Sequence, residues 1–299
     1  TGFSGGARLA AAAAVIEKRI KGVIACGASF ASNTAYVPIQ NTFVYIGVVG
    51  DEDFNLTEMQ LGLNFLKKRK FDAQLMVFNG GHQWPPKEYA DKALRILTLK
   101  MMQKGIFDKN DELAQKFYLL DYQFNKNLIE NSLMLQAEED LLDLMENYRF
   151  LVGTDSLKNQ LKEIKRSEAY KFQKREAERV KAAEALYRED YMVFLKEDVA
   201  SGNLAPLGFW EEELKKLNEI ANNGKEADKK MVKRLKSTIA IATIEFSSAF
   251  TEKDHLNNLI FGNILLTMVY PENAPAYLQI IRLASKKGEY GMALYYLEE

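Results

Sequence analysis

The sequence predicts an α/β fold with a parallel sheet in its first third, followed by an all-α portion. Over residues 1–104, short apolar runs alternate with helical runs, which is the order of elements in an open α/β sheet. The apolar runs are hydrophobic almost throughout, as is typical of parallel strands covered on both faces. After Gly105 no β-rich run recurs, and long amphipathic patterns follow. We therefore predict an α/β domain over 1–104 and an α-helical domain over 105–299.

The first elements are predicted from composition and from the glycines that end them. Residues 7–20 are rich in alanine and contain no proline, and Gly22 follows them, which together predict a helix. Residues 23–26 form a short apolar run between glycines and predict a buried strand. The segment 27–41, rich in Ser, Asn and Ala, predicts a loop.

The next elements repeat the strand–helix alternation. Residues 42–49 are almost all β-branched or aromatic and predict the strongest strand of the chain. A helix is predicted over 56–71, and a strand over 73–78 that Gly80 and Gly81 bring to an end. Pro86 suits the first turn of a further helix that runs to about residue 104.

The remaining chain predicts helices only. Its amphipathic runs lie near residues 109–151, 155–200, 209–222, 226–250, 254–269, 275–287 and 289–299. The stretch 158–189 is densely charged with both signs mixed, which favours a solvated helix with i,i+4 pairs over a functional patch.

Composition narrows the classes of function. The chain has 299 residues, 47% of them hydrophobic, which is enough for two domains with sizeable cores. Its net charge of -1 lacks the basic excess of a nucleic-acid binder. One cysteine, Cys26, excludes an internal disulfide, and two histidines with one cysteine make a zinc site improbable. We therefore expect no metal and no cofactor.

The sequence predicts no transmembrane segment. No apolar run reaches the roughly 18 residues that a bilayer crossing needs. The alanine-rich stretch 10–16 is too short and follows a turn rather than a basic start, so it is not a signal peptide. Any signal peptide would lie upstream of Thr1, which leaves a cytoplasmic and a periplasmic location both open.

The residues that carry chemistry begin with a Gly-x-Ser-x-Gly turn, Gly2-Phe3-Ser4-Gly5-Gly6. A serine hydroxyl needs a base to become a nucleophile, a tight turn to expose it, and backbone N–H groups to hold the developing oxyanion. Gly2 and Gly6 are expected to permit the turn, because bulk there would clash with the neighbouring strand and helix. The Gly5 N–H, at a helix N-terminus, is the expected oxyanion donor.

A base and an acid follow the serine in the expected order. Gly50-Asp51-Glu52-Asp53 comes directly after the strand predicted at 42–49, and Gly80-Gly81-His82 directly after that at 73–78. The order Ser, Asp, His, each in a loop after a strand, is that of a hydrolase nucleophile-elbow fold. The candidate catalytic residues are therefore Ser4, Asp53 and His82, with Asp51 as the alternative acid.

With these motifs, residues 1 to about 104 resemble the C-terminal half of an α/β-hydrolase of the small esterase kind. They are similar to the phospholipase/carboxylesterase and dienelactone hydrolase groups in Gly2-Phe3-Ser4-Gly5-Gly6, in the Gly-x-x-Asp loop of Gly50 and Asp53, and in Gly81-His82. In these groups the acid closes Gly-x-x-Asp, so the resemblance implies Asp53. It covers about a third of the chain and is specific for fold and triad, and much less so for substrate.

The turn at Ser4 normally follows a buried strand, and no strand is predicted between Thr1 and Ser4. We expect that strand to precede residue 1, together with the first half of the sheet, the second oxyanion donor and much of the acyl pocket. The strand at 23–26 would then expose an unpaired edge. Residues 1–299 by themselves are accordingly expected to show no useful esterase activity.

A second resemblance lies at residues 275–299, which look like one tetratricopeptide-type helical hairpin. Ala284 and Ala293 allow two helices to approach, and Gly288 makes the turn. Only one copy is recognisable, so an ordinary helical hairpin is an equal alternative.

Two hypotheses of function result. The first is a serine hydrolase that acts on a small-molecule carboxylic ester, with Trp84 beside His82 lining the acyl pocket or serving as a packing anchor like Trp210. The second is a non-enzymatic protein whose helices bind a protein or peptide partner and whose hydrolase part is vestigial. His255, near a helix start, is expected at the surface in either case.

Overall fold

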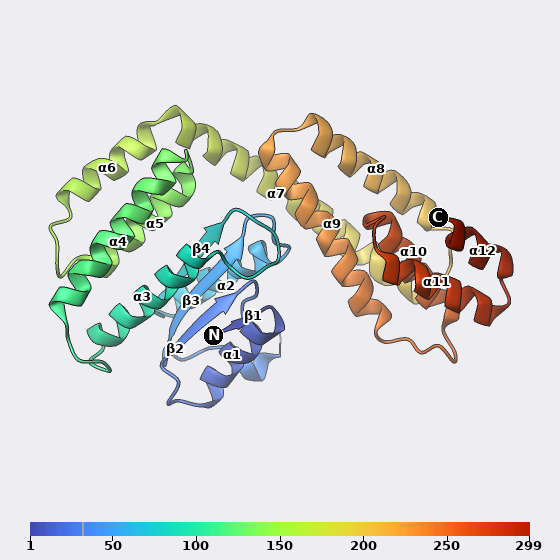
Figure 1. Cartoon of the computed structure of the whole chain (residues 1–299), viewed down its shortest axis with the longest axis horizontal. Coiled ribbons are helices and arrows are strands. Elements are labelled where there is room, and N and C mark those ends of the chain that lie inside the picture. The colour runs from blue at the N-terminus through green and yellow to red at the C-terminus, as the bar shows by residue number, and fades with distance from the viewer. Residues whose placement is uncertain (32) are drawn as a thin grey trace. The chain divides into compact units, whose positions relative to one another are not determined.

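The computed structural model describes residues 1–31 and 33–299 (Figure 1). Ser32, in the segment predicted as a loop over 27–41, lies outside the described residues. The chain divides into two compact units, Thr1–Ala177 and Glu178–Glu299, and each is described by itself.

The first unit is built on a parallel sheet of four strands in the order β1-β2-β3-β4 (Figure 1). The strands are β1 (Gly2–Phe3), β2 (Gly22–Cys26), β3 (Val44–Gly50) and β4 (Ala73–Phe78). Because all four are parallel, their carboxyl ends meet at one edge of the sheet, and the loops that follow them gather there.

The short strand β1 differs from the sequence prediction, which placed no strand ahead of Ser4 in this chain. Gly2 pairs with Ala25 and Phe3 with Cys26, so the two residues continue the sheet beside the end of β2. Two residues are too few to produce a periodic pattern, which is why this strand is not visible in the sequence.

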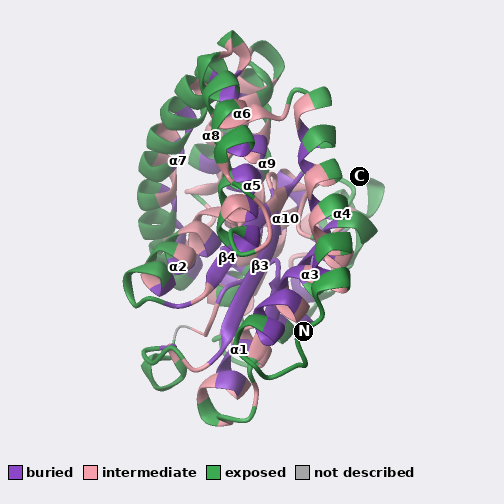
Figure 2. Ribbon diagram, turned by 90° about the vertical axis from the view of Figure 1, so that its left-hand side faces the viewer, coloured by how far each residue is buried: buried purple, intermediate pink, exposed green. Residues whose placement is uncertain are grey.

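Alternating side chains of the strands face two helical layers. Val23, Ala25 and Tyr45 pack with helices α1 (Gly5–Ile16) and α2 (Leu56–Lys68) on one face. Neighbouring residues such as Ile24 and Ile46 pack with α3 (Lys87–Gln103) on the other. Figure 2 shows β3 and β4 in the colour of buried residues, as expected of strands covered on both sides.

Helices α4 (Asp111–Glu130), α5 (Met134–Tyr148) and α6 (Asp155–Arg166) complete the first unit with α3. A core of buried apolar side chains joins them, among them Leu99, Leu141 and Tyr148. Helix α5 also lies against β4, where the side chains of Gln74 and Asn147 exchange hydrogen bonds of 2.8 and 3.3 Å. Helix α5 therefore covers β4, and the α4 and α6 helices pack on α5.

Two predicted helices are each divided in the structure. The run at 109–151 breaks between α4 and α5, where Ser132 has a φ of 59°. The run at 155–200 breaks between α6 and α7 (Glu168–Ser201) at Ser167, whose backbone is extended. The Ser167 hydroxyl accepts the Tyr170 N–H at 3.2 Å, a capping contact that begins a new helix. Hydrophobic periodicity runs through both breaks, so pattern alone does not reveal them.

Helix ends differ from the predicted ones by a few residues. Helix α1 begins at Gly5 rather than at residue 7 and ends at Ile16 rather than at residue 20, because Glu17 is already extended. Helix α2 ends at Lys68, three residues before the predicted end of 56–71.

The regular elements of the second unit are all helices among its described residues. This unit consists of the rest of α7 with α8 (Leu207–Asn223), α9 (Glu226–Ser247), α10 (Leu256–Val269), α11 (Ala274–Lys287) and α12 (Tyr290–Glu298). One core is built around Trp210, Leu235 and Phe261, and a smaller one around Ile264 and Ile280.

The predicted fold class, α/β followed by all-α, is confirmed. The predicted boundary after residue 104 marks a change in the type of secondary structure, whereas the division after Ala177 reflects packing. The domain boundary after residue 104 therefore stays a prediction. Within residues 1–31 and 33–299, none of the helices combines the length and apolar character that a bilayer crossing demands.

Candidate functional site

Ser4 lies on the sharp turn between β1 and α1. Its backbone angles are φ 51° and ψ -121°, a region that residues with a Cβ adopt only when their surroundings enforce it. The Ser4 N–H donates to the Cys26 carbonyl at 2.8 Å, which anchors the turn to the end of β2. The turn therefore carries the serine side chain at the carboxyl edge of the sheet.

The two outer glycines of the motif differ in their roles. A Cβ at Gly2 would lie 2.1 Å from the Gly6 carbonyl oxygen, so only glycine fits there. A Cβ at Gly6 would meet no described atom within 4 Å. The steric role predicted for Gly2 is confirmed, and that predicted for Gly6 is wrong, because helix α1 leaves open space on this side.

The predicted oxyanion donor is the first residue of α1. The opening amides of a helix have no intrahelical acceptor, and the helix dipole favours negative charge beside them. Gly5 follows Ser4 directly and begins the helix, so its N–H has both properties. Its role towards an oxyanion stays a prediction.

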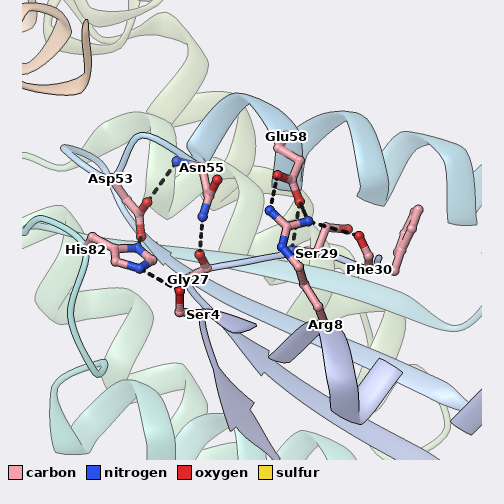
Figure 3. A network of polar contacts seen from close by, with 9 residues as sticks. All are labelled: Ser4, Arg8, Gly27, Ser29, Phe30, Asp53, Asn55, Glu58 and His82. Atoms are coloured by element: carbon pink, nitrogen blue, oxygen red, sulfur yellow. Dashed lines mark hydrogen bonds and ion pairs between the residues drawn. The ribbon is translucent and has the colours of Figure 1, made fainter. Parts of the chain in front are cut away.

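The structure brings Ser4, His82 and Asp53 together in one chain of contacts (Figure 3). His82 Nε2 lies 2.9 Å from Ser4 Oγ, and His82 Nδ1 lies 2.9 Å from Asp53 Oδ2. The Asp53 carboxylate is buried, whereas the His82 side chain is 24% exposed. With its proton on Nδ1 the imidazole donates to Asp53, which leaves Nε2 free to accept the Ser4 hydroxyl proton. Three residues from three separate loops thus meet in one continuous array of side-chain contacts.

Asp53 is fixed by its neighbour Asn55 on the other carboxylate oxygen. The Asn55 N–H donates to Asp53 Oδ1 at 2.8 Å, which leaves Oδ2 for His82. The Asn55 side-chain amide donates to the Gly27 carbonyl at 2.7 Å, and Asn55 is buried (Figure 3). Asn55 has no distinguishing pattern in the sequence, because Asn is common ahead of a helix.

Gly27 is a second residue of the site that no sequence motif marks. Its φ is 65°, and a Cβ there would lie 2.8 Å from the Phe3 ring and 3.3 Å from both Asp53 Oδ2 and His82 Cε1. Only glycine leaves room for the imidazole and carboxylate to meet. The available signal was its position, directly after the strand predicted at 23–26.

Asp51, the alternative acid, points elsewhere. Its Oδ1 accepts the Gly80 N–H at 3.1 Å, while the His82 imidazole contacts Asp53. The two loops are joined further by hydrogen bonds from the Asp51 N–H to the Phe78 carbonyl (2.8 Å) and from the Glu52 N–H to the Gly80 carbonyl (2.9 Å).

Aromatic rings surround the imidazole. The centroids of Phe3 and Phe54 lie 4.7 and 4.6 Å from that of His82, and Trp84 lies 5.3 Å from Phe3. Trp84 is 60% exposed, so it is not a buried packing anchor. Trp210, in contrast, is fully buried and donates to Asp198, which confirms the packing role predicted for it.

A bidentate ion pair ties the serine helix to the acid helix. Arg8 of α1 contacts both carboxylate oxygens of Glu58 of α2, at 2.8 and 2.6 Å, and donates to the Phe30 carbonyl at 3.0 Å (Figure 3). Glu58 also accepts the Ser29 N–H at 3.2 Å. The helices that follow Ser4 and Asp53 are thus held together beside the site.

The cysteine, the possible metal ligands and the second histidine do not add to this site. Burial raises the pKa of the Cys26 thiol to about 11, so it stays protonated at neutral pH and is a poor nucleophile. In the part of the chain that the structure describes, no group of three or more His, Cys, Asp or Glu side chains could hold a metal ion. His255 is the N-cap residue of α10 and partly exposed, near the helix start as predicted.

Comparisons of this chain with models of protein families, with curated proteins and with solved structures found no match.

Proposed function

We propose that this protein is a serine hydrolase that cleaves a carboxylic ester through Ser4, His82 and Asp53. The observation that carries the proposal is the continuous array from Ser4 Oγ to Asp53 Oδ2, with contacts of 2.9 Å on either side of the imidazole. A loop histidine without a functional role would not be expected to bridge a serine with a strained backbone and a buried carboxylate. Strained backbone and buried charges cost stability, and they are typical of functional sites.

In the proposed reaction Ser4 Oγ attacks the ester carbonyl carbon while His82 Nε2 takes the hydroxyl proton. The tetrahedral intermediate carries its negative charge on the former carbonyl oxygen, which the Gly5 N–H stabilises. His82 then gives the proton to the departing alcohol, leaving an acyl group on Ser4. Water, with His82 again as base, releases the acid. Asp53 holds the imidazole in the required tautomer and stabilises its cation.

The arrangement supports assigning the first unit to the α/β-hydrolase kind that its motifs resemble. A parallel sheet with helices on both faces carries serine, acid and base in loops at the carboxyl ends of β1, β3 and β4. That order and placement are those of a nucleophile-elbow enzyme. The exposed Trp84 ring packs at a tilt against Phe3 beside His82, and it is suited to contact the acyl group of the ester.

The second unit is proposed to bind a protein or peptide. Helices α11 and α12 pack on each other around Ala284 and Ala293, and Gly288 makes the turn with a φ of 85°. These features support a tetratricopeptide-like hairpin, in which a helical surface serves recognition.

The decisive experiment is covalent labelling of the whole protein, with any residues that precede Thr1 included, by a fluorophosphonate probe, followed by mass spectrometry of the modified peptide. Labelling confined to Ser4 and abolished by Ser4→Ala supports the hydrolase. A folded protein that resists labelling would favour the alternative of an interaction protein with a vestigial site.

Kinetics test the coupling of the array in the active protein. Ser4→Ala and His82→Ala should each lower kcat by on the order of 10³-fold or more, with a double variant no worse than the singles, because the residues act as a unit. A double variant that is far slower than either single variant would contradict the assignment.

A further inference from the structure

Beyond the residues of the proposed triad, the loop that carries His82 is held by contacts from the loop that carries Asp53. Gly80, two residues before His82, is bound on both of its backbone polar groups. Its N–H donates to Asp51 Oδ1 at 3.1 Å, and its carbonyl accepts the Glu52 N–H at 2.9 Å.

These contacts extend the sheet past the end of its strands. The β3–β4 ladder ends where Gly50 pairs with Phe78, and the Asp51 N–H then donates to the Phe78 carbonyl. At the next step the Asp51 carboxylate takes the place of a backbone carbonyl as acceptor for Gly80. A side chain therefore supplies the contact that fixes where the backbone leaves the sheet towards His82.

The approach of the two loops leaves little freedom. A Cβ at Gly50 would lie 2.1 Å from the Gly80 carbonyl oxygen and 2.5 Å from that of Gly81. The backbones of the two loops are in direct contact. Because Gly80 is only two residues from His82, a shift of Gly80 also moves the imidazole, which must contact both Ser4 and Asp53. Misplacement of a catalytic group by about 1 Å costs on the order of 10²-fold in rate.

We propose that Asp51 is a positioning residue, which acts as a hydrogen-bond acceptor for Gly80 and thereby holds His82 against Asp53 and Ser4. This role uses the carboxylate oxygen and not its negative charge. The inference rests on the proposed function for its effect on rate, but the geometry that it describes exists independently of turnover.

The test compares Asp51→Ala, which removes the acceptor, with Asp51→Asn, which keeps an oxygen and removes the charge. The first readout is the imidazole ¹⁵N NMR spectrum at neutral pH, which reports the tautomer of His82; His255→Gln assigns the signals, since the chain has two histidines. The second readout is the rate of fluorophosphonate labelling at Ser4. Circular dichroism and thermal melting establish that each variant is folded.

We expect the parent and Asp51→Asn to carry the proton on Nδ1, and Asp51→Ala to show a mixture of tautomers. Labelling should slow by about 10- to 100-fold in Asp51→Ala and by less than about threefold in Asp51→Asn. The inference is overturned if Asp51→Ala keeps the parent spectrum, if Asp51→Asn behaves like Asp51→Ala, or if the parent lacks the Nδ1–H tautomer. A parent with that tautomer and no labelling at Ser4 refutes the proposed function alone, because the spectra still decide the role of Asp51.

Discussion

Ser4 combines a strained backbone with a half-buried hydroxyl that contacts His82, and each of its constraints comes from a different neighbour. Cys26 accepts its N–H, His82 contacts its hydroxyl, and Gly2 lets the turn close against Gly6. A strained backbone conformation at a single residue persists only when several surrounding contacts hold it in place. The turn therefore depends on glycine at one position of the motif and much less at the other.

This difference predicts unequal effects of two alanine substitutions. Gly2→Ala forces a methyl group against the Gly6 carbonyl, so the turn must shift, and Ser4 labelling should fall by about tenfold or more. Gly6→Ala places its methyl group in open space among the described atoms and should leave labelling within about threefold of the parent. Labelling rates of the two folded variants measure the difference, and equal losses would show that both glycines are needed.

Helix α5 illustrates how an element of the helical portion stabilises the sheet. Asp140 is buried and forms an ion pair with Lys92 of α3, and it also accepts the Asn125 amide of α4 at 3.1 Å. A buried charge is tolerated only with such partners. Asn147, two turns further on, bonds to Gln74 in β4. One helix thus joins α3, α4 and the edge strand.

The same helix carries a carboxyl group with an unusual titration. Burial raises the pKa of Asp143 to about 7, Lys67 of α2 opposes the rise, and Asp140 and Glu146 add to it. The folded protein therefore holds this proton more tightly than the unfolded chain does. Its ionisation costs stability above pH 7, and this cost shrinks as the pH falls towards the ordinary value of 3.8.

Asp143→Asn should consequently raise the melting temperature at pH 8, and the gain should diminish at pH 6.5 and again at pH 5. Thermal melting of parent and variant at these three pH values provides the measurement, with Asp155→Asn at an exposed position as the control. A gain that does not change with pH would contradict the perturbed titration.

For the whole molecule, the division into two units assigns α4, α5 and α6 to the sheet rather than to the helices that follow. Leu99 and Met102, on the predicted α/β side of residue 104, are buried in a core that α4 and α5 complete. Without these helices the apolar end of α3 and the β4 edge would face water, and an exposed strand edge invites aggregation.

The two boundaries make different predictions for shortened chains. A chain cut after Ala177 should melt cooperatively and keep the labelling rate at Ser4, whereas one cut after residue 104 should melt at a lower temperature or aggregate. Calorimetry and light scattering of the two chains decide between them. Equal stability of both chains would favour the boundary predicted after residue 104.

Local pattern was sufficient for most elements, with β1 and the two helix breaks as exceptions, and for selecting Ser4, Asp53 and His82 as candidates. A strand needs only a run of apolar residues, and 73–78 agrees with β4 to the residue. The order of Ser4, Asp53 and His82 after turns and strands likewise follows from neighbours along the chain. Each of these features is written in a few consecutive residues, so it can be read without knowing what packs against it.

The contacts that assemble the candidate site were decided by the tertiary structure. The contacts of Gly27, Asn55 and Asp51 do not follow from local pattern, because their partners lie 28 or 29 residues away along the chain or on another strand. The choice of Asp53 over Asp51 depends on which carboxylate the β3–β4 register aims at His82. The helix breaks at 131–133 and at Ser167 also depend on long-range packing, since hydrophobic periodicity continues across them. Hydrophobic periodicity indicates which side of an element is buried. A functional site depends on which elements come together, and only the folded chain specifies that.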